Sequence, residues 1–366
     1  MNNKKSAISI IVLLLVGILT YVTIEGSFLS GDKRTDSVRL LAWVGYDEEE
    51  VIKEFEKRSE YSLQVETFFG ADKMFAKLSQ NPSTYDAVVI DPEYISKLSE
   101  ADLIRSLDES KFDFSHYYRE FKKFEPCYID GNLECVVVRF GSSGLMYNDK
   151  YLNKEDVDSY KVLWKEKYKN RIGTYDFYLP NIGQVSLKRA NEDPFNITDK
   201  EFNRVKKELN ELKPQIRKIH GGARSLLSSF ESGDIWITML GGESFVSLLR
   251  SKGVPAKWTI PKEGGLVWFE SIGVTSGAEN VDGAYELIRF LQSPKGQHLL
   301  MKRDAYNSNA PSKKAVDMLS AEERKIRHVP TDSAYHALLK KLTPRSLPSN
   351  QTESEWQNAW NEFKSQ

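Results

Sequence analysis

The stretch IPKEGGLVWFESIGV, residues 260–274, has the pattern of a turn followed by a strand. Pro261, Gly264 and Gly265 are turn-forming residues, and the run from 266 to 274 is rich in apolar and β-branched side chains. The stretch therefore predicts a strand that begins directly after a tight turn.

Trp268 and Glu270 lie two positions apart in that strand, so their side chains share a face. Together they offer a cation an aromatic surface, with roughly 0.5–2 kcal/mol of cation–π attraction, and a carboxylate that accepts a charge-assisted hydrogen bond. The alternative is a strand with one core tryptophan and one surface glutamate, which is the commoner use of these residues. The two residues by themselves leave both interpretations open.

The same stretch resembles the spermidine/putrescine-binding family, the extracytoplasmic solute-binding proteins of ABC importers. In that family a proline-lysine-glutamate-glycine-glycine turn precedes a Trp and, two positions later, an acidic residue that holds a ligand amine. The resemblance runs from about residue 40 to the C-terminus and includes apolar residues at helical spacing, namely Ala284, Leu287, Ile288, Phe290 and Leu291. It implies an α/β, two-lobed type II periplasmic-binding-protein fold. Each lobe would be an open, mostly parallel sheet flanked by helices, and two interlobe crossings would join the lobes.

The resemblance also implies how the chain is divided between the lobes. We expect a first lobe made of residues 37–140 and 271–308, and a second lobe made of residues 145–268 and 309–366. The ligand would be captured between the lobes as they close.

The segment VVVRFGSSGLMYN, residues 136–148, matches a family segment that crosses from one lobe to the other. Gly141 and Gly144 would let the backbone bend there, as a hinge of domain closure requires. Arg139 lies just before them, and two uses for it stay open. It can form an ion pair between the lobes, or it can contact an anionic ligand.

Strand and helix patterns alternate near the start of the globular part. A strand is predicted over residues 40–46, Val51, Ile52 and Phe55 recur at helical spacing, and residues 85–90 have the pattern of a buried strand. This βαβ alternation predicts an open parallel sheet, whose ligands bind beyond the carboxyl ends of the strands. The segments that follow the two strands are therefore expected to line the cleft.

Five residues are implied as ligand contacts that the chain shares with the family. The aromatic walls would be Trp43, Tyr46, Trp268 and Tyr306, and the retained acid would be Glu270.

The chain departs from the family pattern at four further ligand contacts. Gly45, Tyr178 and Asn181 stand where the family has acids, and Leu240 stands where it has a Trp. These departures keep open the alternative that the same fold binds a different small organic solute.

Four acids near the expected cleft are candidates to replace the missing ones. Asp91 and Glu93 follow the buried strand and would form a rearranged cation site, and Asp176 and Glu243 are further candidates. The alternative for the first two is turn chemistry together with the negative charge that a helix N-terminus favours.

The only two cysteines, Cys127 and Cys135, flank a strong turn signal at Asp130-Gly131-Asn132. They could therefore face each other across a hairpin, and an extracytoplasmic compartment is oxidising. We predict a disulfide between them.

The N-terminal segment, residues 1–30, has two lysines followed by an apolar run from Ala7 to Ile24. It is expected to be a signal peptide or an uncleaved membrane anchor that leaves the rest of the chain outside the cytoplasm, in the periplasm. An uncleaved anchor would favour a third function, that of a membrane-tethered ligand sensor.

The composition and the motifs argue against several other classes of function. The net charge of −1 gives no support for nucleic-acid binding. No phosphate loop, nucleophile elbow or zinc-protease helix is present, and the five histidines are scattered. We expect a monomeric, non-enzymatic protein without metal or cofactor, which captures a polyamine and delivers it to an ABC permease in the membrane.

Overall fold

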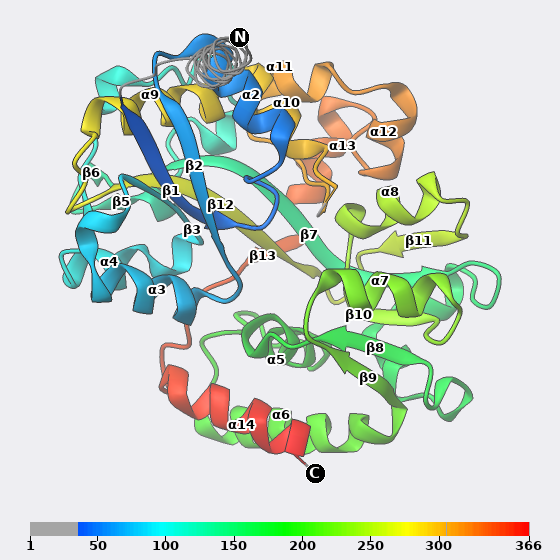
Figure 1. Cartoon of the computed structure of the whole chain (residues 1–366). Coiled ribbons are helices and arrows are strands. Elements are labelled where there is room, and N and C mark those ends of the chain that lie inside the picture. Colours follow the sequence, from blue (N-terminus) through cyan, green and yellow to red (C-terminus); the bar gives the residue numbers. More distant parts are fainter. Residues whose placement is uncertain (1–35, 305, 366) are drawn as a thin grey trace, which may run out of the picture.

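The computed structural model describes residues 36–304 and 306–365, and the predicted signal peptide or anchor at 1–30 lies outside them. Within the described part of the chain, no helix is both long enough and apolar enough to cross a membrane. Two lobes stand one above the other, with long strands running between them (Figure 1).

The first lobe is built on a sheet whose strands run in the order β2-β1-β3-β12-β7. The first three strands are parallel, and β12 and β7 are antiparallel to their neighbours. Chain order β1-β2-β3 in that spatial order sends successive right-handed crossovers to opposite faces, so helices cover both sides (Figure 1). The strands are β1 (Ser37–Trp43), β2 (Ser62–Phe68), β3 (Ala87–Ile90), β7 (Val136–Asn148) and β12 (Gly265–Thr275). The helices are α2 (Glu49–Arg58), α3 (Ala71–Gln80), α4 (Ile95–Glu100), α9 (Val281–Gln292) and α10 (Pro294–Met301).

The second lobe continues the sheet from the far half of β7, in the order β7-β10-β8-β9, with β11 also paired to β7. Strands β8, β9 and β10 are parallel to one another. The strands are β8 (Ile172–Tyr175), β9 (Ile216–His220), β10 (Ile237–Gly241) and β11 (Ala256–Thr259). The helices are α5 (Tyr178–Lys188), α6 (Asp199–Leu212), α7 (Ala223–Glu231), α8 (Glu243–Ser251) and α14 (Glu353–Ser365).

Two antiparallel strands, β7 and β12, carry the chain between the lobes, and their register pairs Trp268 with Gly141 and Glu270 with Arg139. The predicted strand at 266–274 is confirmed as β12, and the predicted α/β fold is confirmed as well. A third connection is made by residues 345–352, which lead from β13 (Leu342–Pro344) down to α14 (Figure 1).

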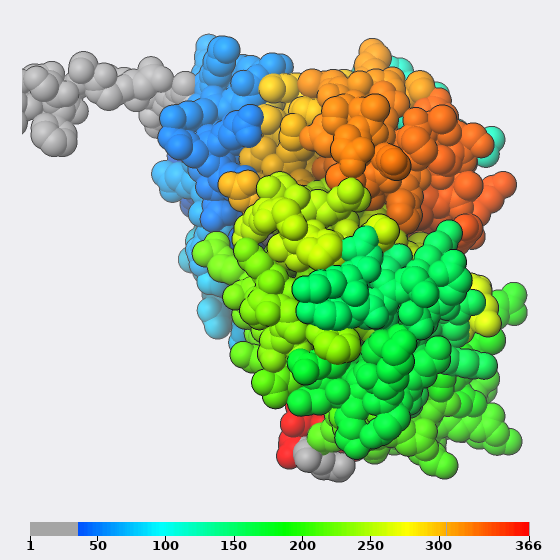
Figure 2. Space-filling view, turned by 90° about the vertical axis from the view of Figure 1, so that its right-hand side faces the viewer, coloured from blue at the N-terminus to red at the C-terminus, as the bar shows by residue number. Residues whose placement is uncertain are grey.

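The assignment of residues 309–366 to the second lobe is wrong for most of that range. Helices α11 (Lys313–Asp317), α12 (Ala321–Ile326) and α13 (Asp332–Leu339) lie with the first lobe, as the orange residues do in both views (Figures 1 and 2). The reason is aromatic packing, because Tyr335 of α13 stacks on Tyr118 with ring centroids 3.9 Å apart. Helix α12 also touches the second lobe, where the Trp258 indole of β11 donates to the Ile326 carbonyl at 2.7 Å. Helix α14 lies wholly on the second lobe, where Trp356 stacks on Phe202 of α6.

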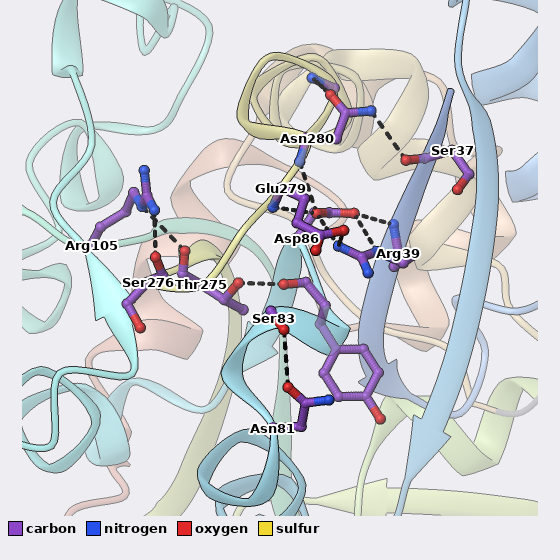
Figure 3. Close-up of polar contacts among 12 residues, drawn as sticks. Ser37, Arg39, Asn81, Ser83, Asp86, Arg105, Thr275, Ser276, Glu279 and Asn280 are labelled. Atoms are coloured by element: carbon purple, nitrogen blue, oxygen red, sulfur yellow. Dashed lines mark hydrogen bonds and ion pairs between the residues drawn. The ribbon is translucent and has the colours of Figure 1, made fainter. Parts of the chain in front are cut away.

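A charged network lies at the strand ends of the first-lobe sheet that point away from the cleft (Figure 3). Asp86, which is fully buried, accepts hydrogen bonds from the Arg39 guanidinium at 2.8 and 3.0 Å and from the backbone amides of Glu279 and Asn280 at 3.0 Å. Burial alone would raise the pKa of Asp86, but the hydrogen bonds from Arg39 and from the backbone outweigh it and lower the pKa. This single carboxylate therefore ties β1 and β3 to the start of α9.

We predict that Asp86→Asn lowers the free energy of unfolding by about 2–3 kcal/mol, because it removes the buried charge partner of a partly buried guanidinium and leaves only the exposed Glu279. Since the pKa of Asp86 is lowered, the stabilisation is present above about pH 4 and is lost as the pH falls through that lowered pKa. Urea unfolding at pH 7 and pH 3 would measure the loss of unfolding free energy in Asp86→Asn, with the exposed Glu100→Gln as a surface-charge control. Equal losses at the two pH values would contradict the prediction.

Candidate functional site

The predicted cleft loops of the first lobe lie together at the carboxyl ends of β1 and β3. Trp43 ends β1, and its indole nitrogen donates a 2.9 Å hydrogen bond to Oδ1 of Asp91, which follows β3. The Trp43 ring also contacts Phe68, at a centroid distance of 4.7 Å, and Phe69. The prediction that these two loops share one edge of the sheet is confirmed, while their contact with a ligand stays a prediction.

Gly45 occupies a family acid position for a local backbone reason. Its φ is +103°, a conformation that side-chain-bearing residues rarely adopt, and its amide donates to Asp47 Oδ1 at 2.8 Å. An acid at this position would strain the turn that presents Trp43 and Tyr46.

A first buried cluster surrounds Arg139 on the crossing strands. Its Nε lies 2.7 Å from Glu270 Oε2, and its Nη2 donates to the Tyr306 hydroxyl at 2.6 Å. The Tyr306 hydroxyl in turn donates to Glu270 Oε1 at 2.6 Å. The guanidinium also lies over the rings of Tyr46 and Tyr306, at 4.8 and 4.4 Å from their centroids. Both oxygens of Glu270 are therefore engaged by groups of the chain itself.

Trp268 lies beside this cluster and faces Tyr306 edge to face, with ring centroids 5.7 Å apart. Because Glu270 also contacts Tyr306, the prediction that Trp268 and Glu270 share a face is confirmed. Gly141 makes room for the indole, since a Cβ there would lie 2.1 Å from the Trp268 ring. The glycine predicted as a hinge residue is thus also a packing requirement of the candidate site.

A second buried cluster surrounds Arg345, on the third connection between the lobes. Its Nη2 donates to Asp91 Oδ2 at 3.0 Å, and its Nε lies 3.1 Å from Glu93 Oε1. The side chains of Arg345, Asp91 and Glu93 are 7%, 3% and 2% exposed. The guanidinium also lies 5.3 Å from the ring centroid of Phe177, which belongs to the second lobe. This residue contacts both lobes at once.

The two carboxyls of the Arg345 cluster are hard to ionise. Burial raises the pKa of Asp91; Arg345 opposes that shift, while the charges of Glu93 and Glu270 add to it. Burial likewise raises the pKa of Glu93 against the opposing charge of Arg345. The charge of Glu270 also raises the pKa of Asp91, so the two clusters interact electrostatically.

Glu243, a candidate ligand acid, connects α8 to the crossings between the lobes. Its Oε1 accepts hydrogen bonds from the Ser142 amide at 2.9 Å and from Asn309 Nδ2 at 3.2 Å. Its Oε2 is buried and has no hydrogen-bond partner among the described residues. Burial raises the pKa of Glu243 to about 7, against hydrogen bonds from the backbone that lower it.

Asp176, the other candidate acid, is not part of either cluster, and its role as a ligand acid stays a prediction. Its carboxylate accepts hydrogen bonds from Trp360 Nε1 at 2.6 Å and from Lys364 Nζ at 2.8 Å, so it holds α14 in place. Tyr178 similarly donates to Glu353 at the start of α14. Asn181 is buried and accepts from the Thr174 hydroxyl at 2.6 Å. The residues at two family acid positions thus serve internal packing.

The lobes touch along the cleft. A Cβ at Gly222, in the loop after β9, would lie 4.0 Å from the ring of Phe69, which follows β2. Lys97 of α4 and Glu353 of α14 form an ion pair of 3.0 Å at the side of the cleft. Beside this pair lies a cavity of about 250 Å³ between α3, α4 and α14. The two lobes are therefore in contact with each other in this structure.

The predicted disulfide is not formed in the structure, where Cys127 and Cys135 are free, buried thiols. Burial and a side-chain hydrogen bond with the neighbouring Cys127 thiol raise the pKa of Cys135, but the hairpin register does not pair the two residues directly. Asp130 and Gly131 have φ values of +49° and +83° and form a two-residue turn, so the residue opposite Cys127 is Glu134. The turn was predicted correctly, but Cys135 lies one position beyond the pairing.

The sequence patterns did not identify Arg345 as part of the site. It lies in the segment RSLP, which carries no periodicity and no motif. Its position beside Asp91 follows from the pairing of β13 with β12, and the Arg345 amide donates to the Val267 carbonyl at 3.1 Å.

We predict that Glu243→Gln changes the pH dependence of stability. Because the folded-state pKa of Glu243 is raised to about 7, the carboxyl stabilises the protein at low pH, and this stabilisation is lost as the pH rises from about 4.3 to 7. The amide keeps an oxygen for Ser142 and Asn309 and cannot ionise. Relative to the wild type, the variant should therefore gain about 2–3 kcal/mol between pH 4.5 and 8. Thermal and urea unfolding across this range would measure the gain, and a constant difference would contradict the prediction.

Comparisons with known proteins agree with this geometry. The chain matches the family model described as bacterial extracellular solute-binding protein over residues 50–326, more than half of its length. It is 24% identical over 304 residues to the spermidine/putrescine-binding periplasmic protein 1 of Haemophilus influenzae, covering 80% of each chain. It is 26% identical over 264 residues to the spermidine/putrescine-binding periplasmic protein of Salmonella typhimurium, covering 71% of this chain and 73% of that protein.

Solved structures show the same fold. The spermidine/putrescine ABC transporter substrate-binding protein of Streptococcus pneumoniae superimposes with a TM-score of 0.72 at 20% identity, covering 90% of this chain and 98% of that one. The chain is therefore a member of the bacterial extracellular solute-binding protein family, with the two-lobed fold of the type II periplasmic binding proteins.

Proposed function

We propose that this chain captures an organic amine between its two lobes, outside the cytoplasm, and presents it to the permease of an ABC importer. The observation that carries the proposal is the combination of aromatic faces with buried carboxylates where the lobes meet. The Trp43 indole donates a hydrogen bond to Asp91, and Trp268 and Glu270 both contact Tyr306. Aromatic faces and carboxylates are the groups that bind an ammonium ion. The names of the relatives, which refer to spermidine and putrescine, support an amine as the solute.

Capture would follow from the way the cleft is divided between the lobes. Trp43 and Asp91 extend from the first lobe, and Phe177 and Gly222 from the second. A ligand that contacts both sets of groups does so only when the lobes are closed, so it stabilises the closed state. The permease would then recognise the closed form by the relative position of the two lobes.

A specific observation favours a second candidate, the same fold with a solute other than a polyamine. The three candidate acids Asp91, Glu93 and Glu270 already contact guanidinium groups of the chain. A polyamine, with two or more positive charges, would have to compete with these groups for the same oxygens. The third candidate, a membrane-tethered sensor, depends on residues 1–30, which lie outside the described structure.

We predict that Trp268→Ala weakens the tightest-binding amine about tenfold, because removal of a cation–π face costs about 1.4 kcal/mol. Isothermal titration of residues 31–366 with putrescine, spermidine, monoamines and small carboxylates would first identify that amine. Trp236→Ala is the matched control, because Trp236 is also half-buried but precedes β10, at the edge of the sheet opposite the cleft. Its affinity should stay within twofold of the wild type. Binding of carboxylates alone would contradict an amine-binding cleft.

A further inference from the structure

The chain supplies its own cation at a position suited to a ligand amine. The Arg345 guanidinium bonds to Asp91 Oδ2 at 3.0 Å, lies 3.1 Å from Glu93 Oε1, and faces the Phe177 ring at 5.3 Å. Two carboxylates and an aromatic face are the environment that an ammonium ion would otherwise occupy. Trp43, an expected ligand wall, bonds to the other oxygen of the same Asp91 carboxylate at 2.9 Å.

Arg345 reaches this position from a segment that belongs to neither sheet. Residues 345–352 connect β13 to α14, and the Arg345 backbone is anchored to Val267 of β12. The side chain is 7% exposed, so it is enclosed between the lobes rather than lying on the surface. The cation therefore fills part of the space between the first-lobe acids and the second lobe.

The charges of the two clusters do not balance. Asp91, Glu93 and Glu270 can carry three negative charges, whereas Arg139 and Arg345 carry two positive charges. His220, at the end of β9, adds no charge at neutral pH, because burial lowers its pKa. Burial raises the pKa of Asp91, and the charges of Glu93 and Glu270 raise it further, although Arg345 opposes the shift. Among the residues that the structure describes, the two clusters together carry one more negative charge than positive charges when all three carboxyls are ionised.

We propose that Arg345 is a specificity-determining residue whose guanidinium occupies one amine position of the cleft, so that the cleft favours organic cations with a single positive charge over diamines and longer polyamines. The proposal rests on the proposed function, because it assumes that the solute is an amine. A monocation would neutralise the remaining carboxylate without displacing Arg345. A diamine would bring a second charge to a site that has no carboxylate left for it, and an unpaired buried charge is costly.

The test compares two amines of equal chain length, butylamine with one charge and putrescine with two. Isothermal titration gives the ratio of their dissociation constants for the wild type, Arg345→Gln and Arg345→Lys. We expect the Gln variant to shift the ratio at least tenfold toward putrescine, because it frees a carboxylate for the second amine. The Lys variant keeps the positive charge, so its ratio of dissociation constants should stay within threefold of the wild-type ratio. A ratio in the Gln variant within threefold of the wild type would overturn the proposal.

Arg39→Gln is the matched control, because Arg39 also pairs with two carboxylates, Asp86 and Glu279, at the edge of the sheet opposite the cleft (Figure 3). Its ratio should equal that of the wild type. If Arg345→Gln does not fold, as thermal unfolding would show, Asp91→Asn tests the same charge balance from the other side. It should weaken butylamine at least tenfold, and unchanged affinity would overturn the proposal.

The outcomes separate this proposal from the proposed function. If the wild type binds amines and the ratio does not depend on residue 345, amine capture stands and the role of Arg345 is rejected. If no amine binds to the wild type or to any variant, the proposed function fails, and the role of Arg345 fails with it. A wild type that binds putrescine at least tenfold more tightly than butylamine rejects the role of Arg345 alone.

Discussion

Arg139 and Glu270 face each other across the two strands that carry the chain between the lobes, and both side chains are almost completely buried. Desolvation of two charges is expensive, so such a pair persists only when the remaining donors and acceptors are also satisfied. Here Tyr306 and the Leu300 carbonyl accept from the guanidinium, and Tyr306 donates to the carboxylate. A shift of one residue in the pairing of β7 and β12 would place the two charges on opposite faces of the sheet, where they could not contact each other. The ion pair therefore specifies the register on which the candidate site depends.

That register in turn positions the aromatic residues. With Glu270 opposite Arg139, Trp268 lies opposite Gly141, the one residue type that leaves room for the indole. Tyr306 and Tyr46 then contact the guanidinium with their rings. The same buried charge that fixes the strands thus collects three of the four aromatic residues implied by the family resemblance. It also occupies the carboxylate expected to bind the ligand, which links the stability of the hinge to the chemistry of the cleft.

Local patterns predicted the parts of the fold that depend on local physics. Alternation along β12 placed Trp268 and Glu270 on one face, and the order of strands and helices placed the loops of Trp43 and Asp91 at one edge. The missed features depend on contacts between distant residues. Arg345 is brought to Asp91 by a connection 254 residues away in sequence, and Asp176 is engaged by Lys364 of the last helix. The hairpin of Cys127 and Cys135 shows a third limit, because a correct turn still leaves the pairing uncertain by one residue.

The placement of the last helix has a consequence for how the protein is made. Strand β12, residues 265–275, lies between β3 and β7 in the first sheet, and α14, residues 353–365, covers the core of the second lobe. Neither lobe can be completed before these late segments have left the ribosome. Pairings between such distant segments also form slowly, because a long loop must close first. The native pairing of both lobes therefore forms only after most of the chain has been synthesised.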